Sequence, residues 1–221
     1  MRGYGQFCPI AIASEVFAER WTPLVVRELY CGSHRFNDLL RGLPRMPRSV
    51  LVQRLRTLEA TGVIERRVNA RHTGVEYHLT DAGQELSQIV LELGDWGKRW
   101  AHTEVRPERI DTDLLVWDMH RRLATEEFPA GRTVIHIAFT GAVERGYWLI
   151  LEHGAVSVCW NDPGFDADVT LVADTVVLHQ VWLGEVPFSA ALRQGKLKLS
   201  GPRDLCQAFP DWLQLSVFAT R

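Results

Sequence analysis

Hydrophobic residues in the first hundred positions recur at helical spacing within short segments, and proline or glycine separates these segments. This pattern predicts four helices, over residues 9–19, 22–31, 35–40 and 47–60. The period then changes to two, because residues 63–68 and 75–79 alternate and predict the two strands of a hairpin. Thr80 is the expected cap of a long helix whose apolar side carries Trp96 and Trp100.

The second half of the chain has a different pattern, in which alternating segments outnumber helical ones. After a linker near Pro107, a helix is predicted over 113–128. Strands are predicted over 133–140, 146–152, 155–160, 167–173 and 196–199, and helices over 176–183, 188–192 and 202–209. The sequence therefore predicts two domains: a mainly α domain over 1–104, and an α+β domain with a largely antiparallel sheet over 105–221.

Composition narrows the class of protein. No apolar run approaches the roughly 18 residues that span a bilayer, and the first residues lack the apolar core of a signal peptide, so we expect a cytoplasmic protein without membrane contact. The four cysteines form no C-x-x-C pair, which argues against a disulfide framework or a zinc site, and no cofactor or metal is expected. No nucleophile with a base and no phosphate loop is recognisable, so the sequence does not predict an enzyme.

The charge is unevenly distributed, although the net charge of the chain is only −2. Residues 20–72 contain 11 arginines and 4 acidic residues, whereas residues 105–221 carry a net charge of −4. Arginine binds phosphates and guanine edges through a planar fork of donors. A basic segment in a neutral protein is typical of a nucleic-acid site, although a solvated surface is the alternative for any single arginine.

A short helix, a turn, a second helix and a hairpin follow one another in the order of a winged helix-turn-helix. In such a unit the second helix, here 47–60, enters the major groove and the hairpin reaches the flanking backbone. If Leu51, Leu55 and Leu58 face inward, the opposite face presents polar and basic side chains. The predicted DNA-binding residues are Arg35, Arg48, Ser49, Gln53, Arg56, Arg67, Arg71 and His72.

The resemblance to a known family rests on an ordered set of residues between 8 and 100: Cys8-Pro9, Trp21-Thr22, Arg27-Glu28-Leu29, Arg35-Phe36-Asn37-Asp38-Leu39, Leu51-Val52-Gln53-Arg54-Leu55, Gly62-Val63-Ile64-Glu65-Arg66 and Glu76-Tyr77-His78-Leu79-Thr80. These residues resemble the HxlR family of bacterial transcriptional regulators. The resemblance implies a homodimer on double-stranded DNA with a pseudo-palindromic operator, and dimerisation through the first helix and the long helix after the hairpin. Trp96 and Trp100 would then lie at the interface, and ordinary core packing is the alternative.

Three positions of this segment qualify the resemblance. In the family, a serine is frequent at the start of the helix that enters the major groove, which we call the reading helix (47–60 here), but this chain has Pro47. Val52 likewise stands where a small hydroxyl residue is common, so the DNA sequence that the protein prefers is left open. Some relatives sense oxidants or electrophiles with a cysteine near the N-terminus. Cys8 precedes a predicted helix, whose N-terminus favours a thiolate. Cys8 is therefore a candidate redox sensor, and a passive cysteine is the alternative.

Residues 130–215 resemble a sterol-carrier-protein-like domain, on the alternating segment 168–174, the turn at 183–185 and the segment 190–197. Such a resemblance implies helices over a curved sheet and an apolar tunnel for a small molecule. Trp148, Trp160, Trp182 and Phe188 either line such a pocket or fill it. The predicted function is a DNA-binding regulator that responds to an apolar effector, and the alternative is a lipid- or sterol-carrying protein whose first domain binds other proteins.

Overall fold

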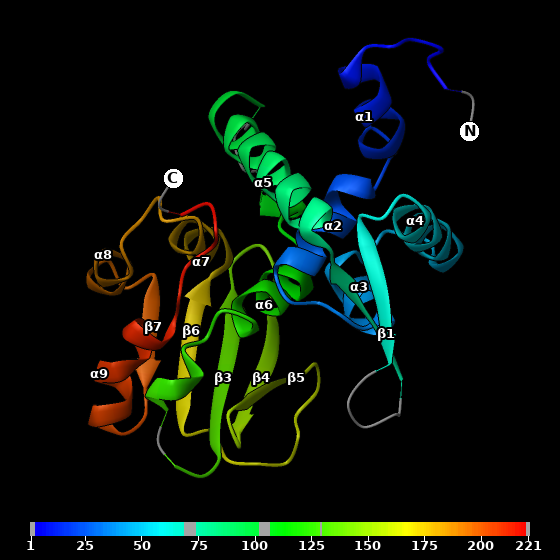
Figure 1. Cartoon of the computed structure of the whole chain (residues 1–221). Helices are drawn as coiled ribbons and strands as arrows, with labels where there is room; N and C mark the ends of the chain where they lie inside the picture. The colour runs from blue at the N-terminus through cyan, green and yellow to red at the C-terminus, as the bar shows by residue number, and fades with distance from the viewer. Residues whose placement is uncertain (1–2, 69–73, 102–106, 129, 220–221) are drawn as a thin grey trace. The chain divides into compact units, whose positions relative to one another are not determined.

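The computed structural model describes residues 3–68, 74–101, 107–128 and 130–219, and the chain divides into two compact units, Met1–Ala101 and His102–Arg221 (Figure 1). Each unit has its own hydrophobic core. Among the residues described, no helix is long and apolar enough to cross a membrane.

The first unit consists of helices and one hairpin, in the order that the sequence predicts. Its elements are α1 (Pro9–Phe17), α2 (Thr22–Tyr30), α3 (Phe36–Gly42), α4 (Arg48–Ala60), β1 (Ile64–Val68), β2 (Val75–Leu79), α5 (Asp81–Trp96) and a π-helical turn, Gly97–Ala101. The Thr80 side chain caps α5 by accepting a hydrogen bond from the Gly83 amide at 3.2 Å. The core combines residues of α2, α3, α4, β1 and α5, including Leu51, Leu55 and Leu58. The mainly α winged helix-turn-helix is therefore confirmed.

The second unit is an α+β fold around one five-stranded sheet. Its elements are short 3-10 turns at Pro107–Arg109 and Thr125–Glu127, α6 (Thr112–His120), β3 (Thr133–Thr140), β4 (Arg145–Glu152), β5 (Ala155–Cys159), β6 (Val169–Asp174), α7 (Thr175–Trp182), α8 (Phe188–Arg193), β7 (Leu197–Ser200) and α9 (Arg203–Trp212). The strand order is β5-β4-β3-β6-β7. All neighbours are antiparallel except β3 and β6, which pair in parallel with Ile137 opposite Leu171.

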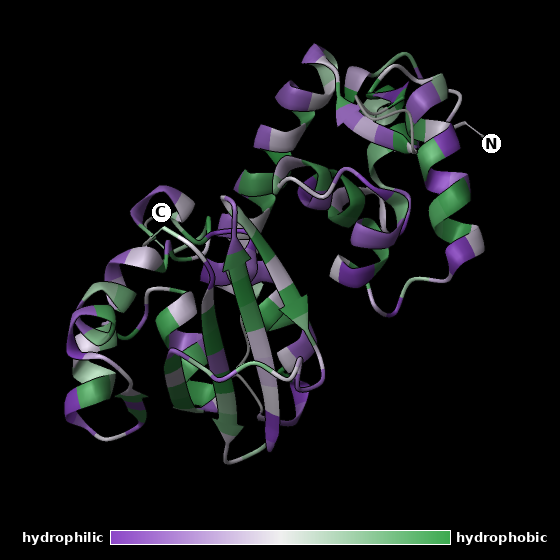
Figure 2. Cartoon of the chain, turned by 90° about the horizontal axis from the view of Figure 1, so that it is seen from below, coloured by the Kyte–Doolittle hydropathy of each residue, from purple (hydrophilic) through white to green (hydrophobic). Residues whose placement is uncertain are grey.

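Helices cover one face of this sheet and create the core of the second unit. Alternate strand residues such as Ile137, Leu149 and Leu171 are fully buried, as the period of two along a strand requires. In Figure 2, much of the length of these strands is coloured as hydrophobic. Among the core side chains, the Tyr147 hydroxyl lies 2.7 Å from the Thr112 hydroxyl and donates to the Asp113 carboxylate at 2.8 Å. These bonds attach the first turn of α6 to β4.

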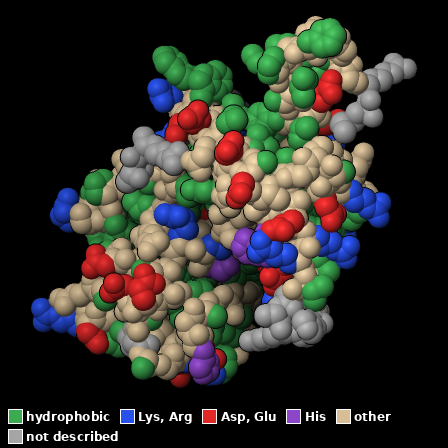
Figure 3. Space-filling model, viewed as in Figure 1, with side chains coloured by type: hydrophobic (Ala, Val, Ile, Leu, Met, Phe, Trp, Pro, Cys, Tyr) green, Lys and Arg blue, Asp and Glu red, His purple; other side chains and the backbone are tan. Residues whose placement is uncertain are grey.

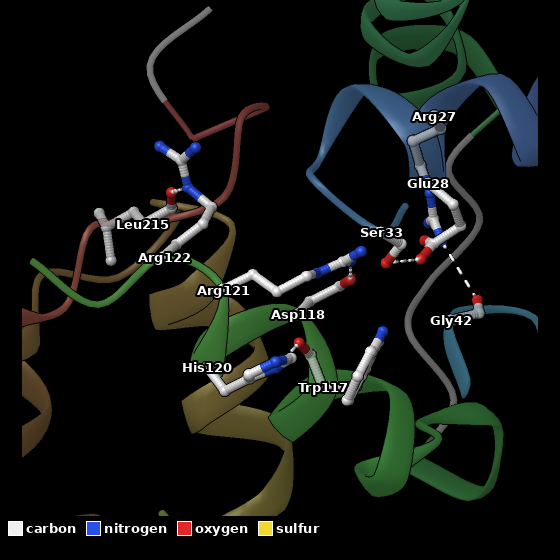
Figure 4. A network of polar contacts seen from close by, with 10 residues as sticks. All are labelled: Arg27, Glu28, Ser33, Gly42, Trp117, Asp118, His120, Arg121, Arg122 and Leu215. Carbon is white, nitrogen blue, oxygen red and sulfur yellow. Dashed lines mark hydrogen bonds and ion pairs between the residues drawn. The ribbon is translucent and has the colours of Figure 1, made fainter. Parts of the chain in front are cut away.

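One predicted helix of the second unit is too long. Residues 113–128 were expected to be helical throughout, but α6 ends at His120. The Arg122 side chain then donates to the carbonyl of Leu215 (Figure 4). Leu123 forms an isolated bridge with Leu213. The helix does not continue because the backbone of this segment bonds instead to a distant one: the Ala124 amide donates to the Trp212 carbonyl, and the Gln214 amide donates to the Arg122 carbonyl, each at 2.9 Å.

Candidate nucleic-acid interface

The exposed face of α4 is the centre of the candidate interface. The side chains of Ser49, Val52, Gln53 and Arg56 are exposed along α4, whereas Leu51 is fully buried. Pro47 is the N-cap residue and supplies no side-chain hydrogen bond, and the first turn contains no acidic residue. The positive end of the helix is therefore open to an anion such as a phosphate. Gln53 can form two hydrogen bonds to adenine, and Arg56 can do so to guanine.

Arg48 and Arg54 differ from Arg56 in their surroundings. The guanidinium of Arg48 lies 5.1 Å from the centre of the Phe36 ring on α3, so a cation–π contact orients this exposed side chain at the start of α4. Arg54 turns away from the exposed face and bonds to the segment between α1 and α2. Arg48 is exposed, as the pattern of α4 predicted, whereas no role was predicted for the half-buried Arg54.

The hairpin places further cations beside the helices. Arg67 on β1 has a side chain that is 58% exposed and pairs with Glu65. Arg35, the N-cap residue of α3, is 60% exposed and pairs with Glu76 of β2 through Nε at 3.3 Å. Both can reach a phosphate, because such exposed ion pairs are weak. The predicted contacts Arg71 and His72 lie outside the described residues.

The turn between α3 and α4 presents a cation that the predicted set omitted. Arg45 is exposed in this turn, one residue before the buried Met46. In a helix-turn-helix, residues before the reading helix lie near the DNA backbone. The run of arginines in residues 20–72 was the available signal for this residue.

Two histidines lie together at the base of the hairpin. The rings of His34 and His78 stack with their centroids 4.3 Å apart, and Nδ1 of His34 lies 3.1 Å from the carbonyl oxygen of Tyr77. Burial, followed by the charge of His78, lowers the pKa of His34 below its ordinary value of 6.5. A neutral His34 is therefore favoured in the folded protein.

A buried carboxylate stabilises the helix-turn-helix from within (Figure 4). Glu28 of α2 is fully buried, pairs with Arg27, and accepts a hydrogen bond from the Ser33 hydroxyl at 3.2 Å. Arg27 also donates to the carbonyl of Gly42, the last residue of α3, at 3.4 Å. These bonds connect α2 to the end of α3, immediately before the turn that leads to α4.

A second surface of the first unit is apolar and exposed. Hydrophobic side chains gather over α1 and α5 (Figure 3). The exposed residues include Phe7, Ile10, Ile12, Ile89, Leu93, Trp96 and Trp100. Trp96 is 56% exposed and Trp100 is 71% exposed, so neither fills the core of the single chain. We call these seven residues the apolar surface. Cys8, an exposed free cysteine at the N-cap position of α1, lies next to Phe7 in the sequence.

The four aromatic residues proposed for a ligand pocket occupy different environments. Trp182 is 5% exposed within the core of the second unit, and Trp160 and Phe188 pack against that core. Trp148 stacks on His136 at 4.6 Å. A half-open pocket of about 210 Å³ lies elsewhere in this unit and is lined by Thr125, Phe128, Ala130, Gly131, Leu151, Glu152, His153, Gly154 and Ala155. Within the described ranges, no group of three or more histidine, cysteine or acidic residues is suited to a metal ion.

Comparisons with known proteins find a matching family model in each half of the chain. A family model described as HxlR-like helix-turn-helix matches residues 16–105, and one described as the SCP-2 sterol transfer family matches residues 125–214. YvaP, an HTH-type transcriptional regulator of Bacillus subtilis (strain 168), is 36% identical over 97 residues, which cover 43% of this chain and 90% of that protein.

Two further proteins are similar over the same half. Rv3095, an HTH-type transcriptional regulator of Mycobacterium tuberculosis (strain H37Rv), is 39% identical over 92 residues, which cover 40% of this chain and 56% of that protein. Among solved structures, the redox regulator HypR in its reduced form is 32% identical, with a TM-score of 0.39, over 42% of this chain and 92% of that chain.

Proposed function

The chain belongs to the HxlR-like helix-turn-helix family of transcriptional regulators, and we propose that it reads a pseudo-palindromic operator as a homodimer, with one α4 in each major groove. The observation that supports this proposal best is the exposed face of α4. It combines side chains that can read bases, Gln53 and Arg56, with a helix N-terminus that lacks acidic residues. A protein of this kind acts in the cytoplasm and needs no catalytic group.

The apolar surface supports the dimer. Large apolar side chains that are more than half exposed, such as Phe7, Ile10 and Trp100, favour burial against a partner. Both α1 and α5 contribute to this surface, and a two-fold axis would bring each onto a second copy. Phosphate contacts from Arg35, Arg67 and the predicted Arg71 and His72 would then flank each reading helix.

The proposal is tested by measuring the affinity for DNA upstream of the protein's own and neighbouring genes, at two salt concentrations. The wild type should give a specific complex that weakens with salt. A variant with Arg48→Ala, Gln53→Ala and Arg56→Ala should fold and lose about 100-fold or more in operator affinity, because each base contact contributes roughly 1–3 kcal/mol.

A matched variant controls for the loss of charge. Arg193→Ala, Gln194→Ala and Arg203→Ala changes the same residue types at exposed positions of the second unit. This control should bind the operator as the wild type does. Equal operator binding by the α4 variant and the wild type would contradict the assignment of α4 as the reading helix. If selection from randomised DNA with the wild type yields no specific complex, the assignment of the protein as a DNA-binding regulator would be contradicted.

For the second unit we propose a further role, the binding of a small apolar effector. The match to the SCP-2 sterol transfer family supports this role. Phe128 and Leu151 contribute to the half-open pocket, but Thr125, Glu152 and His153 line it as well, and its accessible lining is more polar than apolar. Its volume of about 210 Å³ also lies below the roughly 300–1,000 Å³ of usual ligand sites. A short acyl chain fits such a volume better than a sterol does. Titration with fatty acids of increasing length, followed by tryptophan fluorescence, tests this role, and no saturable change at any length would contradict it.

A further inference from the structure

Arg54 connects the reading helix to the turn that follows α1. Its Nη2 donates to the carboxylate of Glu19 at 2.7 Å, and its Nε donates to the backbone carbonyl of Arg20 at 3.1 Å. The Arg54 side chain is only 12% exposed, and that of Glu19 is 37% exposed. The planar guanidinium therefore makes two bonds to one short segment, which fixes direction as well as distance.

The segment that receives Arg54 is itself well defined. The amide of Thr22 donates to the carbonyl of Glu19 at 3.0 Å, which closes a tight turn between α1 and α2. Trp21 adopts the left-handed conformation with φ 79°, which is uncommon for a bulky residue and persists only where the surroundings hold it. The guanidinium of Arg20 lies 5.3 Å from the centre of the Trp21 ring. We call residues 19–22 the elbow.

The elbow lies between the two surfaces on which the proposed function depends. Helix α1 ends at Phe17, separated from the elbow by one residue, and carries Ile10 and Ile12 of the apolar surface. Helix α4 carries the exposed residues that would read bases. The bonds of Arg54 therefore join the back of the reading helix to the helix that would meet the second copy.

We propose that Arg54 is a positioning residue for operator recognition: by bonding α4 to the elbow, it fixes the separation and rotation of the two reading helices in the dimer. The inference rests on the proposed function, since it assumes DNA binding by α4 and a dimer through α1. The physical consequence concerns spacing. One added base pair between half-sites moves the second half-site by about 3.4 Å and rotates it by roughly a tenth of a turn. A firmly held pair of helices discriminates against such a shift, whereas a loosely held pair tolerates it.

The experiment measures affinity for three operators, which have the natural spacing and one base pair more or less, together with random DNA. The variants are Arg54→Gln, Arg54→Lys and Glu19→Gln. Arg132→Gln, which removes the ion pair with Glu152 in the second unit, is the matched control. Arg54→Gln should bind the natural operator about tenfold less tightly than the wild type and lose most of its discrimination between spacings. Its affinity for random DNA should equal that of the wild type, because the phosphate contacts remain. The operator affinity and the spacing discrimination of Arg54→Lys should lie between those of the wild type and Arg54→Gln. The lysine ammonium can pair with Glu19 but cannot form both of the bonds that the guanidinium forms.

Each outcome bears on the proposal separately. Wild-type discrimination by a folded Arg54→Gln dimer would overturn it, and so would an equal loss on operator and random DNA, which would mean that Arg54 contacts phosphate instead. If Arg54→Gln does not fold, Glu19→Gln removes the same ion pair at a more exposed residue, and its spacing profile decides. Failure of the wild type to bind any operator would instead contradict the proposed function.

Discussion

Replacing Gly42 by alanine tests whether the buried carboxylate of Glu28 stabilises the helix-turn-helix. A Cβ atom at Gly42 would lie 1.8 Å from Oε2 and 2.2 Å from Cδ of Glu28. Ordinary contacts are at least 3.4 Å, so the carboxylate must move by about 1.5 Å within a fully buried site. Such a shift breaks the 3.2 Å bond from Ser33 and disturbs the pair with Arg27.

The magnitude follows from these bonds. A hydrogen bond to a charged group contributes about 1.5–3 kcal/mol, and alanine regains roughly 0.5–1 kcal/mol in a helix relative to glycine. Gly42→Ala should therefore lower the free energy of unfolding of the first unit by about 2–4 kcal/mol, as measured by urea titration with circular dichroism. Gly97→Ala is the control, because Gly97 has helical angles and open space around its Cβ position. A loss at Gly42 no larger than that at Gly97 would refute the reasoning.

Three further predictions concern association, pH and the second unit. Trp96→Glu should convert the proposed dimer to a monomer in sedimentation velocity, whereas Phe165→Glu, at another exposed aromatic residue, should not. A dimer of both variants would contradict the role of the apolar surface. Because burial lowers the pKa of His34, the unfolded chain binds the proton more readily, and stability should be lost as the pH falls through about 6.5. His34→Gln should reduce this loss in urea titrations between pH 7.5 and 5.5, and an unchanged slope would argue against it. Tyr147→Phe should lower the free energy of unfolding of the second unit by about 1–2 kcal/mol in the same assay, because Thr112 and Asp113 lose their hydrogen bonds to the hydroxyl. An unchanged free energy of unfolding would show that water replaces the hydroxyl.

Local patterns predicted most elements because the residues that end them are local. Gly62 follows α4 with φ 72°, a conformation that favours glycine, and the cap at Thr80 begins α5 as expected. The leucine spacing of α4 identified its buried face, so its exposed candidate residues followed directly. The sequence therefore sufficed to identify α4 and its buried and exposed faces.

Features that depend on distant contacts could not be predicted in this way. Helix α6 ends early because Leu123 pairs with Leu213, ninety positions away. The bonds of Arg54 to the elbow join segments 35 residues apart, and nothing in the spacing of the two segments indicates them. The apolar pattern of α5 does not determine which of its apolar residues pack against α2 and which remain exposed, so it could not decide whether Trp96 lies in the core or on the surface.

The parallel pairing of β3 with β6 also determines the order in which the second unit can assemble. Strands β3, β4 and β5 follow one another as antiparallel neighbours and can form early through short turns. Strand β6 must instead return past two strands to reach β3, and β7 can join only after β6 is in place. A chain shortened before Val169 would leave one edge of β3 without its partner strand, open to pairing with another molecule. The topology of the sheet therefore predicts slow folding of this unit and aggregation of truncated chains.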